Sequence, residues 1–186
     1  MIVNYSVREV APKELASMTG LSPAMQRDWR RVGHITKEDA GWSSFTLQDV
    51  AEIALRKTLA DSGLGAVVTK PIFESDDLHA ILSSITWWMI EADQWAVPAE
   101  IIDALGTADV DRFRLVEQIT GVASGAVSRL LIFTPASGTV VLQNEGFTVD
   151  DFRPGIVQVV VQLDDLGQRA ARLSHRALVT VEGLAA

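Results

Sequence analysis

Four polar side chains suited to nucleic-acid chemistry lie close together near the N-terminus: Gln26, Arg27, Arg30 and Arg31. A Gln amide can form two hydrogen bonds with adenine, and an Arg guanidinium can form two with guanine or bind a backbone phosphate. We predict that Gln26 and Arg27 contact base edges of double-stranded DNA, and that Arg30 and Arg31 contact phosphates. Three further residues complete the predicted DNA-binding set: Lys13, Ser22 and Lys37.

Two short helices joined by a tight turn are predicted to position these side chains. Pro12 suits the first position of a helix, because a proline there loses no hydrogen bond within the helix, and Gly20 can end that helix in a left-handed conformation. Ser22 is a favoured N-cap residue, and Pro23 suits the first position of the second helix. This order of elements is typical of a helix-turn-helix that binds DNA.

An apolar stripe should orient the second helix. Met25, Trp29 and Val32 recur at i, i+4 and i+7, which is the spacing of one helical face, so we expect the arginines to project from other faces. Taken alone, the segment is equally compatible with an ordinary helical hairpin whose arginines form a solvated face.

The following residues favour the DNA-binding alternative. Residues 34–44 form a polar connection in which Ile35 and Trp42 are the expected apolar residues of a short two-stranded wing. A third helix should then begin at Thr46, because Thr46 as N-cap and Asp49 three residues later make a capping box. We expect this helix to end at Gly63.

Short motifs along residues 5–65 carry a family resemblance: Glu14-Leu15-Ala16, Thr19-Gly20-Leu21-Ser22, Arg27-Asp28-Trp29, Gly33, Ile35, Gly41-Trp42, Phe45, Asp49-Val50 and Gly63-Leu64-Gly65. In this order they resemble the DNA-binding domain of the MerR family of bacterial transcription regulators. The resemblance implies a winged helix-turn-helix whose second helix enters the major groove, with Arg27 as its helix arginine. The chain departs from the family pattern at Gln26, His34 and Ser43.

Charge is distributed unevenly along the chain. Residues 1–65 hold eight Lys/Arg and eight Asp/Glu, so the net charge of −8 belongs to residues 66–186. The acidic part should therefore face away from DNA. Because the first part is neutral, one copy should bind DNA modestly and with strong salt dependence, and we expect a homodimer on a palindromic site.

Residues 66–186 are predicted to form a second domain, after a DNA-binding domain at 1–65. Pro71 indicates a linker or an edge strand at 66–73. The remaining predicted elements are helices at 75–92, 98–105, 110–119 and 164–176, and strands at 127–133, 139–142, 156–163 and 177–181. The whole chain is thus expected to be α+β, with a small mixed α/β C-terminal domain that contains a sheet of about four strands.

The sequence does not favour an enzyme. The three histidines lie far apart in sequence, and the adjacent acidic pairs lie at element boundaries, where capping or solvation explains them. The loop at 121–126 lacks the Lys of a phosphate-binding loop. We therefore predict no catalytic residue, metal or cofactor.

Three tryptophans, Trp87, Trp88 and Trp95, are predicted to pack in a core or a dimer interface, against the C-terminal sheet or a second protomer. An effector site is the alternative. The C-terminal domain would then dimerise, bind a small-molecule effector or bind a partner protein. No segment is apolar enough to span a bilayer, and no signal-peptide pattern begins the sequence, so we expect a cytoplasmic protein without a membrane partner. The absence of cysteine excludes disulfides and thiolate metal sensing.

Two functions remain open from the sequence. The first is a bacterial transcription regulator that binds DNA as a dimer. The second is a phage-type DNA packaging, excision or assembly protein that uses the same DNA-binding fold.

Overall fold

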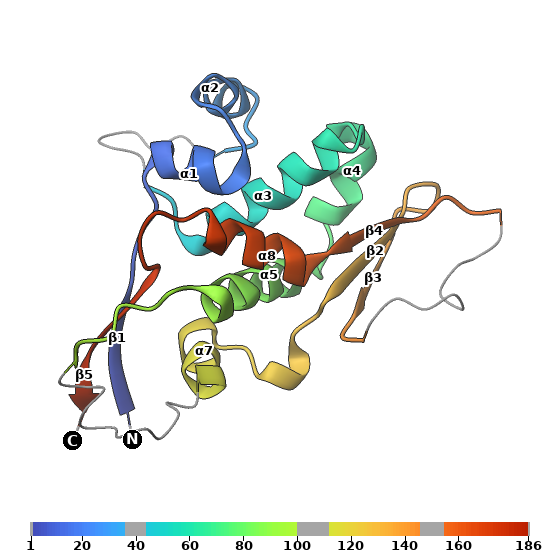
Figure 1. Ribbon diagram of the computed structural model, residues 1–186. Coiled ribbons are helices and arrows are strands. Elements are labelled where there is room, and N and C mark those ends of the chain that lie inside the picture. The colour runs from blue at the N-terminus through green and yellow to red at the C-terminus, as the bar shows by residue number, and fades with distance from the viewer. Residues whose placement is uncertain (1, 36–43, 100–111, 146–154, 186) are drawn as a thin grey trace.

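The computed structural model describes residues 2–35, 44–99, 112–145 and 155–185. Within these ranges the chain is a mixed α+β fold with seven α-helices and two small antiparallel sheets (Figure 1). The helices are α1 (Pro12–Thr19), α2 (Pro23–Arg31), α3 (Leu47–Asp61), α4 (Ala66–Phe73), α5 (Leu78–Ala92), α7 (Arg112–Thr120) and α8 (Leu163–Arg172). The strands are β1 (Ile2–Val7), β2 (Leu130–Thr134), β3 (Thr139–Gln143), β4 (Val159–Gln162) and β5 (Val179–Ala185).

The predicted boundaries of the first three helices are confirmed. Pro12 opens α1, and Gly20 ends it with a φ of 73°. The Ser22 hydroxyl accepts a hydrogen bond from the Met25 N–H at the start of α2. Thr46 and Asp49 form the expected capping box of α3. Each of these features depends on residues within one helical turn, which is why the sequence predicts them.

The predicted wing lies largely outside the described residues, which omit 36–43. At its ends, Ile35 is buried, and Phe45 exchanges two backbone hydrogen bonds with Val10. Most of the helix expected at 98–105 also lies outside the described ranges.

The prediction for residues 66–73 was wrong, because they form helix α4 with Pro71 inside it. In a helix of eight residues, a proline at the sixth position removes one hydrogen bond, the one to the Val67 carbonyl. Val67 is 87% exposed, so water can reach that carbonyl. Ile72, which is fully buried, anchors the same helix in the core.

The strands form a three-stranded sheet in the order β3-β2-β4 and a separate ribbon of β1 with β5. The predicted hairpin between β2 and β3 is confirmed, with Gly138 at a φ of 69° in its turn. The prediction of a single sheet of about four strands was wrong. β5 instead pairs with β1, an N-terminal strand that the sequence analysis did not predict.

The pairing of β1 with β5 brings the two ends of the chain together, and helix α8 packs across α5 (Figure 1). The closest approach is at Gly167, where an added Cβ would lie 2.5 Å from the Ile85 carbonyl oxygen and 2.8 Å from the Trp88 Cβ. The main core is continuous and includes residues from α1, α3, α5 and α8. The division of the chain at residue 65 stays a prediction.

Candidate nucleic-acid interface

Helix α2 is the outermost helix at one end of the molecule, beyond α1 and α3 (Figure 1). It rests on the core through Met25 and Trp29, which are half-buried and pack against the main cluster. Its outer surface is therefore free to meet a large partner such as a duplex.

Arg27 and Arg31 lie on this outer surface. Arg27 is exposed and makes no hydrogen bond or ion pair within the described part of the chain. Arg31 is also exposed, and its nearest carboxylate, that of Asp28, is 3.6 Å away, with both side chains more than two-thirds solvent-accessible. An exposed pair of this kind contributes little energy, so the Arg31 guanidinium remains available to a phosphate.

Two more predicted contacts are accessible. Lys13 at the start of α1 and Ser22 at the N-cap of α2 are both exposed. The Ser22 hydroxyl already accepts from the Met25 N–H, which fixes the first turn of α2. Lys37 lies outside the described residues.

Gln26 requires a correction. Its side chain is 1% exposed, so it cannot contact a base edge. The amide nitrogen donates hydrogen bonds of 3.0 Å to the carbonyl oxygens of Pro12 and Leu21. Gln26 therefore joins α2 to the start of α1 and to the turn between the helices.

Arg30 also differs from the prediction. Its side chain is half-buried, with Cζ 5.6 Å from the centre of the Phe45 ring. Its Nη2 atom is buried and has no hydrogen-bond partner in the described structure. Val32, expected to face the core, is 58% exposed, because α2 ends at Arg31 and the helical period ends with it. The inward face of α2 thus combines Met25 and Trp29 with Gln26 and Arg30.

A polar cluster that the sequence analysis missed anchors α1 to the C-terminal segment. Arg8 binds both oxygens of Glu14, at 2.6 and 2.7 Å. The Ser174 hydroxyl and the His175 N–H also donate to Glu14. The hydrogen bonds from Arg8 hold the pKa of Glu14 below its usual value, and this lowering outweighs the opposite effect of burial. Because Glu14 and Ser174 are far apart in sequence, no local spacing could have predicted this cluster.

The three tryptophans of the predicted site differ in their burial. Trp87 is 2% exposed and belongs to the core of this chain, which was one of the predicted alternatives, so it is not available to a dimer or effector surface. Trp88 and Trp95 are half-buried, and their indole N–H groups donate to the carbonyls of Ser128 and Ile90. Trp87 and Trp88 contact each other edge to face, with ring centres 4.8 Å apart. Trp88 lies beside Gly167 of helix α8, and Trp95 packs against Leu115 and Val181.

No protein-family model matches this chain, and comparisons with curated proteins and with solved structures also found no match. In the described ranges, no cluster of three or more His, Asp or Glu could hold a metal ion. The described helices also include none that is both long and apolar enough to cross a membrane.

Proposed function

We propose that this chain is a cytoplasmic transcription regulator that binds double-stranded DNA through a MerR-like winged helix-turn-helix. The observation that supports the proposal best is the exposure of Arg27 and Arg31 on the outermost helix. Neither has a strong partner among the residues that the structure describes. The capped N-terminus of α2 and its tight junction with α1 are what a helix that enters a groove requires.

Each side chain has a role in this proposal. Helix α2 has nine residues, about 13 Å of helix, and the major groove admits a helix of this diameter. Arg27, at the centre of α2, is placed for bidentate hydrogen bonds to guanine. Arg31, Lys13 and Ser22 are placed for phosphates, which set the position of the helix and not its sequence preference.

The test is DNA binding by the double variant Arg27→Ala, Arg31→Ala. We expect binding to weaken strongly, because the variant loses the Arg27 contact to guanine and the Arg31 contact to a phosphate. The slope of log affinity against log salt should fall by about one unit for the lost phosphate contact. The matched control is Arg169→Ala, Arg172→Ala on α8, which removes the same charge and should leave binding nearly unchanged. Equal binding by the parent chain and the α2 variant would refute the proposal.

Dimer formation is part of the same proposal. One copy offers few cationic contacts, since residues 1–65 are formally neutral, and two copies would double them on a palindromic site. Sedimentation of the full chain with and without a duplex should show two copies on each site. Mapping of sites in the genome distinguishes the two functions: palindromes at promoters support regulation, and one packaging or recombination site supports the phage-type alternative.

A further inference from the structure

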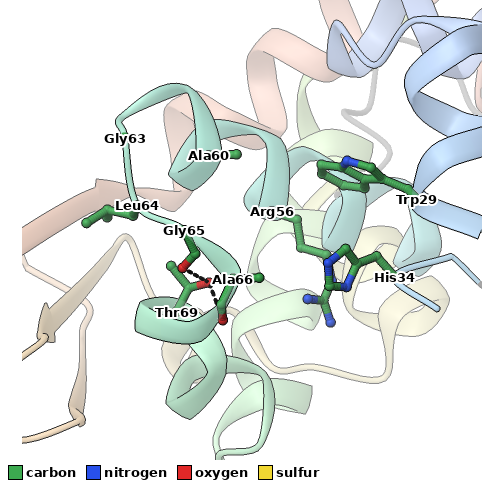
Figure 2. Close-up of a pocket in the computed structure, with 9 residues that line it drawn as sticks. All are labelled: Trp29, His34, Arg56, Ala60, Gly63, Leu64, Gly65, Ala66 and Thr69. Atoms are coloured by element: carbon green, nitrogen blue, oxygen red, sulfur yellow. Dashed lines mark hydrogen bonds between the residues drawn. The ribbon is translucent and has the colours of Figure 1, made fainter. Parts of the chain in front are cut away.

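A cleft beside the candidate DNA-binding helix has the character of a ligand site. Its volume is about 290 Å³, near the lower end of the range for small-molecule pockets. We call it the α2–α4 cleft, and it is lined by Trp29, His34, Arg56, Ala60, Gly63, Leu64, Gly65, Ala66 and Thr69. Figure 2 shows Trp29 and His34 on one side, the turn from Gly63 to Ala66 on the other, and Arg56 between them.

The aromatic side of the cleft is rigid. The Trp29 and His34 rings meet edge to face with centres 5.8 Å apart, and the His34 N–H donates to the Trp29 carbonyl at 2.8 Å. Both rings are only half-buried, so part of each remains open to the cleft. A flat apolar ligand would gain contact area there with little loss of side-chain freedom.

Arg56 supplies the only charge among the lining residues. Its Nε and Nη2 atoms bind one oxygen of Glu52, at 2.8 and 2.7 Å, and its guanidinium carbon lies 3.6 Å from the centre of the Phe73 ring. These contacts fix the guanidinium plane. Nη1 has no hydrogen-bond acceptor in the described part of the chain, so it can still donate to a ligand.

The opposite side of the cleft consists of small residues and backbone. A Cβ added at Gly63 or at Gly65 would meet no atom within 4 Å, which confirms the open space next to this turn. Gly65 is the N-cap of α4 and provides no side-chain cap, so the N–H of Ala66 finds no acceptor among the described residues. This N–H adds a second donor, from the end of the helix that favours negative charge.

We propose that the α2–α4 cleft binds a small planar aromatic carboxylate. The ring lies against Trp29 and His34, and the carboxylate accepts from Arg56 Nη1 and from the start of α4. A carboxylate fits better than a neutral group because Arg56 Nη1 and the Ala66 N–H can only donate. The N-terminus of α4 also adds a partial positive charge beside the Arg56–Glu52 pair. The inference concerns ligand binding and stands whether or not α2 binds DNA.

Benzoate is the probe, and amide spectra of the full-length ¹⁵N-labelled protein are the measurement. The five tryptophans give separate indole signals, and Trp29→Phe identifies the one from Trp29. We expect the Trp29 indole and the Ala66 amide to shift and saturate, with a dissociation constant on the order of 1 mM. Trp95 should not shift. The absence of saturable shifts at these positions overturns the proposal.

Two other probes separate charge from shape. Benzamide has the same ring without the charge, and inorganic phosphate has charge without a ring; each should bind at least tenfold more weakly than benzoate. Equal binding of benzamide overturns the role of Arg56, and equal binding of phosphate overturns the role of the ring.

A blocking variant locates the site. Ala60→Leu adds bulk at an exposed position of α3 that lines the cleft, and Ala80→Leu adds the same bulk at an exposed position of α5 outside it. Benzoate binding should be lost in the first variant and kept in the second. Binding that survives Ala60→Leu places the ligand elsewhere and overturns the proposal.

Discussion

Gln26 stabilises the fold and does not contact DNA, because its amide is buried. Its Nε2 donates to the buried Leu21 carbonyl and to the Pro12 carbonyl at the start of α1. We expect Gln26→Ala to lower the free energy of unfolding by about 1–3 kcal/mol, because the Leu21 carbonyl loses its donor and a small cavity remains. Urea denaturation measures the loss.

Arg27→Ala is the matched comparison, one residue along the same helix. Since Arg27 is exposed and has no partner within the described ranges, its removal should change stability by less than about 0.5 kcal/mol while weakening DNA binding. If Gln26→Ala kept full stability but altered the preferred DNA sequence, the inward position of this side chain would be wrong.

Glu14 gives the fold a defined response to acid. Its pKa is lowered by Arg8, so its contribution to stability is present above the unfolded glutamate value of about 4.3 and is lost as the pH falls through the lower folded value. We expect Glu14→Gln to reduce the free energy of unfolding by about 1–3 kcal/mol at pH 7, and the difference from the parent to shrink below pH ~4. Denaturant titrations at both pH values test this.

Glu74→Gln is the control for that experiment. Glu74 pairs with Lys70 at 3.4 Å, but both side chains are about two-thirds exposed, so the change should be within about 0.5 kcal/mol. An identical loss in both variants would mean that the Arg8–Glu14 contact adds nothing beyond a surface ion pair.

For single residues, the sequence correctly predicted the roles that depend on neighbours within one helical turn. Pro12, Ser22 and Thr46 act within one turn, and all three stand where expected. The positions of Gln26 and Arg30 depend instead on the Pro12 carbonyl and the Phe45 ring, which only the folded chain brings near them. Helical periodicity alone therefore placed these two side chains on the wrong side.

Among the elements, the crossing of α8 over α5 is the most constrained. Gly167 has no room for a Cβ, since backbone atoms of α5 would lie within 3 Å of it. We expect Gly167→Ala to force the helices apart and to destabilise the chain by about 3 kcal/mol or more. Thermal unfolding monitored by circular dichroism gives the magnitude.

Gly125→Ala is the comparison at a site where an added Cβ meets nothing within 4 Å. It should leave the melting temperature almost unchanged. A neutral Gly167→Ala would show that α5 and α8 are not packed as closely as described.

Helix α4 and strand β1 are two elements that the sequence pattern did not predict. Pro71 argued against a helix, yet the helix forms because it is short and because Ile72 is buried in the core. Strand β1 was missed because its partner is β5, at the other end of the sequence. Both outcomes are decided by tertiary contacts that no local window contains.

For the whole molecule, the main core connects the two parts that the charge distribution separates. Helix α1 packs against α8, α3 packs against α5 and α8, and β1 pairs with β5. The Arg8–Glu14–Ser174 cluster adds a polar connection between the same regions. Contacts of this extent favour one cooperative unit over two independent domains.

Calorimetry of the full chain tests this cooperativity. We expect a single transition in which the calorimetric and van't Hoff enthalpies agree, because α1 and α3 cannot lose their packing without exposing α5 and α8. If α2 binds DNA, a duplex that binds only the folded state should move the whole transition to higher temperature. In a chain of two independent domains, DNA would move only the transition of residues 1–65 and leave a second one in place. That outcome would support two domains divided at residue 65 and would contradict the expectation of one cooperative unit.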